Sequence, residues 1–286
     1  MRAFPGRRGE APRHERGRWR HFPALLLATV FLLPLVFMVT GSLRKAGLPP
    51  PRTPELVPDE PTLESYRRAF ELVDLARYTF NSALVVAIAV PLTVLFASWA
   101  GFAMARLPRR AGAWLVAASL VSLMVPITAL LVPRFAIFSW LGLTDTYVPL
   151  VAPALIGMSP FYVLLFYWGF RRIPSELFEA CRLEGLSPFT VWRRIALPLA
   201  RPVTVAVAVL AAVFTWSNFL DPLIYLFDED NFTLPLGLRS LAQVDRQDFP
   251  LLLAGAVTAT VPVIAAFVYV QRFFLNERLT RGWLGR

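Results

Sequence analysis

The sequence predicts an all-α membrane protein with six transmembrane helices, and three observations support this fold class. Of the 286 residues, 56% are hydrophobic, which is more apolar surface than a soluble domain can bury. The apolar residues gather in six runs, each long enough to cross a hydrocarbon core of about 30 Å. The arginines gather between alternate runs, as they do in proteins that cross a membrane repeatedly.

Each apolar run is expected to form one membrane span. The first run is too long for the apolar core of a secretory signal peptide, which has about 7–15 residues, and it lacks a small-residue cleavage site. Proline occurs in several runs, and bilayer helices tolerate it when neighbouring groups satisfy the freed backbone atoms. The expected spans are residues 21–43, 78–104, 112–133, 147–170, 202–226 and 250–271.

The predicted transmembrane domain covers residues 21–275 and lies between two tails. Residues 1–20 are expected to form a basic tail and residues 276–286 a second one. Between the first two spans, a proline-rich loop is expected to lead into a short surface helix.

Arginine placement predicts the orientation of the chain. With the N-terminus in the cytoplasm, the cytoplasmic segments hold 20 of the 29 basic and 6 of the 19 acidic residues. Because cytoplasmic loops are enriched in Lys and Arg, we expect both termini inside. The chain is then a multi-pass membrane protein, and segment 171–201 lies in the cytoplasm.

The composition argues against several classes of function. Cys181 is the only cysteine and there are two histidines, so neither a disulfide nor a His/Cys metal site is expected. Lys45 is the only lysine and no GxxxxGK[ST] loop is present, so this chain is not expected to bind ATP in that way. The positive charge is concentrated in the cytoplasmic segments, which carry a net +14 against −4 for the remaining segments, so the chain's net +10 does not indicate a nucleic-acid partner. We therefore expect no catalytic residues and no cofactor.

Segment 171–201 contains residues that typically start and end helices. Residues 176–184 form an amphipathic pattern, and Gly185 suits the position that ends a helix. Ser187 followed by Pro188 is a typical start for a second short helix, and Pro198 and Pro202 are expected to end it and start the next span. A helix–Gly–helix at the membrane surface is a rigid projection that a partner protein can push or pull.

The motifs of this segment and of the spans resemble those of a known family. Glu179-Ala180-x-x-x-x-Gly185, followed by Ile195 and Pro198, resembles the EAA loop of ABC importer permeases. Asn81-Ser82, Trp216-x-Asn218 and the stretch 233–238 are similar to the carbohydrate-uptake, maltose-type class and its smaller permease subunit. The resemblance covers about residues 20–275.

This resemblance implies a fold, a function and a set of partners. The fold is that of a type I ABC importer permease in a bacterial-type cell membrane, with the EAA loop as a cytoplasmic coupling helix. The chain would move a sugar or oligosaccharide by alternating access and would not itself be an enzyme. It would work with a second permease subunit, usually a different chain, and with an extracytoplasmic solute-binding protein. Two separate ATP-binding subunits would hold the ATP and Mg.

The coupling hypothesis assigns roles to individual side chains of the EAA loop. Glu179 is expected to pair with a basic group of the ATPase, while Leu177, Cys181, Leu186 and Phe189 fill its apolar cleft. Cys181, Glu184 and Leu186 depart from the usual residues of the family. The alternative is an ordinary amphipathic helix resting on lipid headgroups. The expected coupling residues are Glu179, Ala180, Cys181, Gly185, Leu186, Phe189, Ile195 and Pro198.

Polar side chains inside the spans are candidates for the substrate path, because such groups are costly in a bilayer and often functional. Amide groups and aromatic faces also suit sugar hydroxyl and C–H groups. The candidates are Asn81, Ser82, Trp216, Asn218 and Asp221. The alternative is that they anchor helix ends at the outer interface. The acidic loop 228–230 similarly either contacts the binding protein or is simply solvated.

Two other functions remain open from the sequence. An ABC permease could carry another small solute, such as a polyol, a glycerol-phosphate or a peptide. An ion-gradient-driven secondary transporter is the other alternative, although the spans contain few acidic residues that could relay protons.

Overall fold

The computed structural model describes residues 21–51 and 56–284, so the predicted basic tail 1–20 lies outside the described residues. Every regular element of the described chain is helical, which confirms the all-α prediction. The α-helices are α1 (His21–Ser42), α2 (Glu64–Leu72), α3 (Leu75–Arg106), α4 (Arg109–Leu123), α5 (Leu131–Trp140), α6 (Val148–Val151), α7 (Pro160–Arg171), α8 (Ser175–Leu183), α9 (Pro188–Val191), α10 (Leu197–Leu199), α11 (Arg201–Trp216), α12 (Leu220–Tyr225), α13 (Leu234–Val244) and α14 (Phe249–Leu284). Three short 3-10 helices and one π-helix complete the set: η1 (Ile127–Leu130), η2 (Ala152–Ile156), η4 (Glu229–Asn231) and the π-helix η3 (Trp192–Ala196).

The described chain is compatible with six membrane spans. Four helical stretches are long and apolar enough to cross a membrane, and there are up to six if each of two bent helix pairs is one span. The four stretches are Leu25–Ser42, Leu75–Arg106, Val148–Arg171 and Phe249–Gln271. Both bent pairs turn by 83°; the first contains the third predicted span, and the second overlaps the fifth as far as Trp216.

The third predicted span, 112–133, is not one straight helix. Helix α4 already begins at Arg109 and ends at Leu123, three residues before Pro126. Proline lacks an N–H group and disfavours a helical conformation in the residue before it, so the chain cannot continue the helix there. After Pro126 the chain resumes as η1 and α5 in a different direction.

The last two predicted spans also have different limits in the structure. The run 202–226 is divided, because α11 ends at Trp216 and α12 starts at Leu220. The run 250–271 is longer than expected, since α14 continues through Pro262 and past residue 271 to Leu284.

The chain divides into two compact units, and one of them combines Met1–Arg67 with Gln247–Val257. Within the described part of this unit, the Phe249 N–H donates to the Leu48 carbonyl at 3.0 Å. The hydroxyls of Ser42 and Tyr66 lie 2.7 Å apart and join the end of α1 to α2. These bonds fix the loop after α1, which the sequence predicts only as extended chain.

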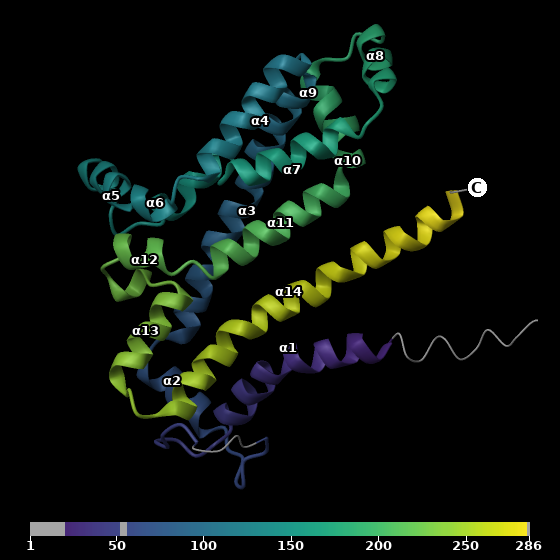
Figure 1. Ribbon diagram of the computed structural model, residues 1–286. Helices are drawn as coiled ribbons and strands as arrows, with labels where there is room; N and C mark the ends of the chain where they lie inside the picture. The colour runs from purple at the N-terminus through teal and green to yellow at the C-terminus, as the bar shows by residue number, and fades with distance from the viewer. Residues whose placement is uncertain (1–20, 52–55, 285–286) are drawn as a thin grey trace, which may run out of the picture. The chain divides into compact units, whose positions relative to one another are not determined.

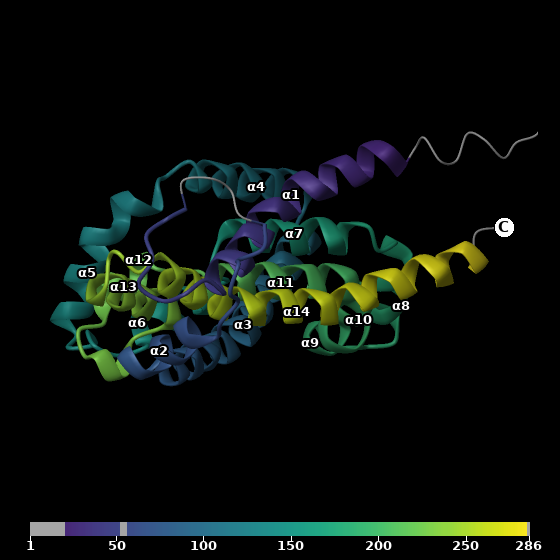
Figure 2. The same cartoon turned by 90° about the horizontal axis from the view of Figure 1, so that it is seen from below.

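The other unit comprises Arg68–Arg246 and Thr258–Arg286, and α3 is its central helix. Helix α3 packs against both α7 and α11 (Figures 1 and 2). Gly101 makes the approach to α7 possible, because a Cβ at this position would lie 2.6 Å from the Phe166 Cβ and 2.9 Å from the Tyr167 backbone nitrogen. Small residues permit such close helix packing in membranes.

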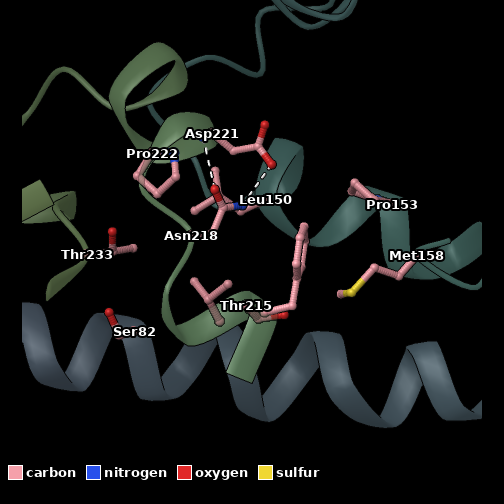
Figure 3. Close-up of a pocket in the computed structure, with 11 residues that line it drawn as sticks. Ser82, Leu150, Pro153, Met158, Thr215, Asn218, Asp221, Pro222 and Thr233 are labelled. Carbon is pink, nitrogen blue, oxygen red and sulfur yellow. Dashed lines mark hydrogen bonds between the residues drawn. The ribbon is translucent and has the colours of Figure 1, made fainter. Parts of the chain in front are cut away.

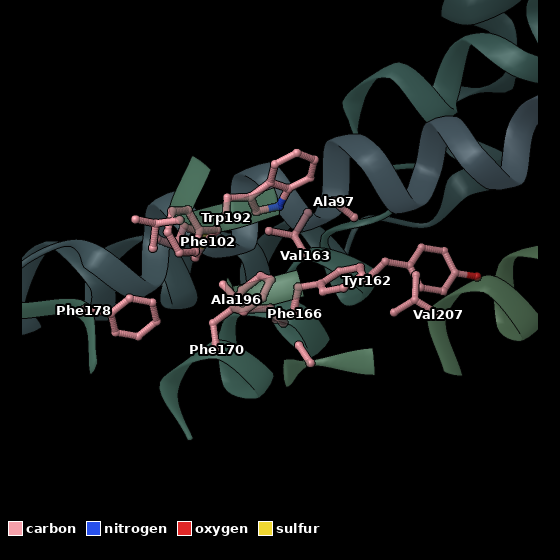
Figure 4. Packing of buried hydrophobic residues seen from close by; sticks show 14 of the residues in the cluster. Ala97, Phe102, Tyr162, Val163, Phe166, Phe170, Phe178, Trp192, Ala196 and Val207 are labelled. Atoms are coloured by element: carbon pink, nitrogen blue, oxygen red, sulfur yellow. The ribbon is translucent and has the colours of Figure 1, made fainter. Parts of the chain in front are cut away.

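An aromatic cluster fills the core at the end of α3 that contacts α8 (Figure 4). The rings of Phe102 and Phe170 meet edge to face, with centroids 5.5 Å apart. Phe166 stacks on Phe170, and the ring centroid of Phe178 of α8 lies 6.1 Å from that of Phe102. Such aromatic pairs add about 0.5–1.5 kcal/mol each beyond the apolar area that they bury. The cluster therefore holds α8 firmly on α3 and α7.

Candidate functional site

The predicted projection is present as α8 and the segment after it. Helix α8 follows Pro174 and ends with Gly185 in the left-handed conformation, at φ +70°. The N–H of Leu186 donates to the Cys181 carbonyl, and that of Gly185 donates to the Arg182 carbonyl, both at 3.1 Å. These two bonds form a Schellman motif, which satisfies the last carbonyls of a helix. The prediction that Gly185 ends the helix is confirmed.

The second short helix begins as expected and ends at Leu199, between Pro198 and Pro202, before α11 starts at Arg201. Ser187 accepts a hydrogen bond from the Thr190 N–H at 3.2 Å, which is the N-cap that the sequence predicts. Pro198 has no N–H to offer the preceding turn, and the Leu197 N–H donates to the Trp192 carbonyl five residues back. The proline is thus accommodated by a π-helical turn, and helical structure continues to Leu199 before the chain bends into α11.

One face of the projection is anchored in the core of the chain itself. Phe178 and Cys181 are each 5% exposed. The Arg106 guanidinium lies 4.3 Å above the Phe178 ring, and the Trp192 indole N–H donates to the Ser98 hydroxyl at 3.3 Å. The hypothesis that Cys181 fills a cleft of a partner is therefore wrong, because its side chain packs inside this chain.

The opposite face of α8 and the turn after it are exposed, and within them the Phe189 ring lies against the core residue Trp192. Glu179, Ala180, Leu186 and Phe189 are all exposed. Leu183 is 90% exposed, more than any other apolar side chain of this face. The predicted set of coupling residues omits it. Helical spacing could have found it, since Glu179 and Leu183 are four residues apart and share a face.

The two remaining predicted coupling residues lie on the segment after the projection. Ile195 is half-buried and packs against the core, whereas Pro198 is exposed. The structure thus divides the predicted set into an outward surface and an inward anchor.

The first two substrate-path candidates hold a loop at the other end of α3. The Asn81 side-chain amide donates to the carbonyls of Asp230 and Phe232, both at 2.9 Å. The Ser82 hydroxyl accepts a hydrogen bond from the Leu234 N–H at 2.8 Å, at the start of α13. Arg77, one turn earlier, pairs with Asp230. These contacts agree with the alternative interpretation, in which the polar residues anchor elements at this end.

Asp221 and Asn218 belong to a buried polar network. The Asn218 amide donates to Asp221 Oδ2 at 2.8 Å, and the Asn218 side-chain oxygen accepts a bond from the Asp221 N–H at 3.3 Å (Figure 3). Arg134 of α5 pairs with Asp221 Oδ1 at 3.1 Å. Sequence reasoning missed Arg134, although a lone arginine at the edge of one apolar run can pair with a lone acid in another. This pair ties α5 to α12.

Three of the five path candidates line one small cavity: Ser82, Asn218 and Asp221 (Figure 3). Its volume is about 20 Å³. A space of that size holds about one water molecule, so a sugar unit does not fit in this conformation. The hydroxyls of Thr215 and Thr233 also border the cavity, and neither has a hydrogen-bond partner among the described residues.

Trp216 lies apart from that cavity. It lines a groove of about 610 Å³ between α3, α11 and the 262–270 part of α14. Its indole N–H donates to the Ala259 carbonyl at 3.0 Å. Apart from Arg201, the groove is lined by apolar side chains and Trp216, so it offers little to recognise sugar hydroxyls. Asn81 lines neither the cavity nor this groove.

A second polar contact joins two loops near α12. One carboxylate oxygen of Asp145 accepts bonds from the backbone N–H groups of Phe227, at 3.1 Å, and Asp228, at 3.0 Å. The bond from Asp228 is the main cause that lowers the pKa of Asp145 from its ordinary value of 3.8. Asp145 itself has φ +60°, a conformation that Asp tolerates better than most residues.

Comparison with known proteins identifies the family. Residues 94–276, which include the projection, α11 and most of α14, match the family described as binding-protein-dependent transport system inner membrane component. The chain belongs to this family. It is therefore an inner-membrane subunit of a transport system and not an enzyme.

The sequence matches to individual relatives in this transport family extend over most of the chain. The arabinooligosaccharides transport system permease protein AraQ of Halalkalibacterium halodurans is 33% identical over 72% of this chain and 73% of its own length. The sn-glycerol-3-phosphate transport system permease protein UgpE of Rhizobium meliloti is 29% identical over 90% of this chain and 93% of its own length.

The fold of this family member also matches a solved structure. A chain of a bacterial ABC transporter involved in the import of the acidic polysaccharide alginate superposes with a TM-score of 0.71. It is 19% identical, and the match covers 93% of this chain and all of that chain. The fold class predicted from the sequence, a type I ABC importer permease, is confirmed.

Proposed function

We propose that this chain is a permease subunit of an ATP-driven importer and that its cargo is a sugar or an oligosaccharide. The EAA projection would couple it to two separate ATP-binding subunits, which bind ATP and Mg. A second permease subunit and an extracytoplasmic solute-binding protein would complete the transporter. The observation that carries the proposal is the two-sided construction of α8.

The two faces of α8 have the properties that coupling requires. The outward face offers the Glu179 carboxylate beside the exposed side chains of Leu183 and Leu186 to a partner. The inward face is fixed through Phe178 to α3 and through Cys181 to the core. A movement of the projection is therefore passed to α3 and α7, because packed side chains resist independent displacement.

Transport would proceed by alternating access. ATP binding to the partner subunits would draw the two projections of the permease pair together and favour an outward-facing arrangement of the helices. Release of the hydrolysis products would reverse this change. Coupling of this kind requires that the partner bind the two arrangements of the permease with different affinities.

The identity of the cargo rests on the relatives. The name of the arabinooligosaccharide permease relative supports a sugar or an oligosaccharide. The glycerol-3-phosphate relative supports the second candidate, a small phosphorylated solute. Measuring the affinity of the cognate solute-binding protein for oligosaccharides and for small phosphorylated solutes distinguishes the two candidate cargoes. An ion-gradient-driven transporter would require uptake without ATP, which vesicles with an imposed proton or sodium gradient can test.

A charge reversal on α8 tests the coupling. We predict that Glu179→Lys reduces ATP-driven uptake by at least about tenfold, since a lost charge-assisted contact costs about 1.5–3 kcal/mol. The complete transporter is reconstituted in vesicles, and uptake is measured together with ATP hydrolysis. Glu64→Lys on α2 makes the same change at another exposed position and should transport normally. Normal uptake by the Glu179→Lys transporter would refute the assigned role of α8.

A further inference from the structure

Four arginines line a pocket at the end of the helix bundle where α8 begins. The pocket has a volume of about 460 Å³, within the range of sites that bind small molecules. Its walls come from the end of α3, the start of α4, the end of α7 and the start of α8. The arginines are Arg106, Arg109, Arg171 and Arg172, and we call this site the arginine pocket.

The positive charge of the arginine pocket is largely uncompensated. Within the described part of the chain, Arg109, Arg171 and Arg172 form no ion pair. All three are exposed, and Glu176 is the only acidic side chain in the lining. Guanidinium groups form paired hydrogen bonds with phosphate oxygens, so this arrangement favours a phosphate-bearing ligand.

The structure fixes the base of the pocket. The buried rings of Phe170 and Phe178 form part of its lining, and the guanidinium of Arg106 lies above the Phe178 ring. The other three arginines project from helix ends that the aromatic cluster joins. The packing of these helix ends therefore fixes the positions from which the arginine side chains extend.

Helix α4, which leads away from the pocket, exposes apolar side chains. Helix α4 starts with Arg109 and Arg110 and then exposes Trp114, which is 79% accessible, and Leu115. Trp114 lies about 8 Å along the helix from Arg109. Tryptophan next to arginine is typical of the level where a bilayer meets water. The pocket therefore opens at the end of a helix whose exposed side chains suit the acyl chains of a lipid.

We propose that the arginine pocket binds a phosphate group, and that the headgroup of an anionic phospholipid presents it. A free phosphate or a small phosphorylated solute shares the same recognition chemistry but would not use the apolar face of α4. The bound headgroup would bridge α3–α4 and α7–α8 and so brace the base of the coupling helix. This site is separate from the outward face of α8 that the proposed function uses.

The test uses the full-length chain purified in detergent. Binding of dioctanoyl phosphatidylglycerol is measured by calorimetry and compared with dioctanoyl phosphatidylcholine, which carries no net charge. We expect the anionic lipid to bind at least about tenfold more tightly, since each arginine near a headgroup contributes about a fivefold factor. Arg109→Gln/Arg172→Gln should lose this preference. Arg193→Gln, an exposed arginine outside the pocket, should keep it.

Two competitors identify the source of the phosphate. Failure of millimolar inorganic phosphate to displace the anionic lipid supports a lipid site, whereas displacement supports a phosphate site that also accepts free solutes. Hexaglutamate binding to the pocket without any lipid or phosphate binding would assign it to a protein partner and overturn the proposal. Equal binding of the two lipids, or unchanged binding by the double variant, would also overturn it. Thermal unfolding without lipid verifies that every variant is folded.

Discussion

Asp145 shows at the scale of a single residue how one carboxylate can join two distant loops. Its carboxylate accepts hydrogen bonds from the backbone N–H groups of residues 227 and 228, and its own N–H donates to the Tyr225 carbonyl at 2.7 Å. These contacts fix the loop between α5 and α6 to the chain that follows α12. The left-handed conformation of Asp145 adds a reason for Asp or Asn at this position.

The charge of Asp145 predicts a pH dependence of stability. Because the folded-state pKa lies below the ordinary value of 3.8, ionised Asp145 stabilises the fold fully above that pH. The contribution is lost as the pH falls through the lower folded-state pKa. Asp145→Asn keeps the conformation and removes the charge, so we expect a loss below about 1 kcal/mol at pH 7, limited by solvent screening.

Thermal unfolding of both proteins in detergent, between pH 7 and pH 3, measures this contribution. The difference between wild type and Asp145→Asn should shrink as the pH falls. A difference that stays constant or grows toward pH 3 would contradict the assigned role of the charge.

At the scale of elements, glycines decide how closely α3 and α7 approach. A Cβ on Gly101 would meet backbone atoms of α7, which no side-chain rotation can relieve. We therefore expect Gly101→Ala to destabilise the chain by about 1–3 kcal/mol, as overpacking does. Gly112 is the matched control, because a Cβ there would meet its nearest atoms at an ordinary 3.7 Å.

Gly112→Ala should be neutral or slightly stabilising, since Ala favours helices over Gly by about 1 kcal/mol. Thermal unfolding midpoints of the two variants in the same detergent provide the comparison. An equal loss in both variants would mean that close packing at Gly101 is not what limits the α3–α7 contact.

The ion pair between Arg134 and Asp221 is a second contact that fixes the position of one helix against another. Both side chains are largely buried, and the pair connects α5 to α12. We expect Arg134→Met to cost about 3–5 kcal/mol, because it leaves a buried carboxylate without its charged partner. Adding Asp221→Asn should recover part of that loss.

A double-mutant cycle of unfolding free energies measures the coupling between Arg134 and Asp221. The exposed pair of Lys45 and Glu60 is the control, and Lys45→Met should cause no measurable change. Additive effects of the Arg134 and Asp221 substitutions would show that the two side chains do not stabilise each other.

At the scale of the whole molecule, the distribution of arginine determines the expected orientation in the membrane. We predict that both termini are cytoplasmic, because the segments on that side hold 20 of the 29 basic residues. A green fluorescent protein fused after Arg286 should fluoresce, and alkaline phosphatase fused there should be inactive. Alkaline phosphatase inserted after Leu48 should be active, and the opposite pattern would reverse the orientation.

Much of this architecture could be predicted from local signals in the sequence. The length of the apolar runs predicts the number of membrane crossings, because a bilayer imposes a minimum length on a helix. Gly185 and Ser187 predict a helix end and a helix start, since both depend on the backbone of a few neighbouring residues. The π-helical turn that accommodates Pro198 was not predictable in this way, because Trp192 and Ala196 of this turn pack in the core against residues distant in sequence.

The sequence alone determined the all-helical membrane fold, the family and the place of the segment that we propose for coupling. Those properties follow from composition, local spacing and motif, which do not depend on contacts between distant residues. Only the tertiary structure decided that Cys181 faces inward, that Leu183 faces outward and that Arg134 pairs with Asp221. It also brought together the four arginines of the arginine pocket, which come from two separate stretches of sequence. Burial and charge pairing arise from packing between helices, and no short segment of sequence encodes that packing by itself.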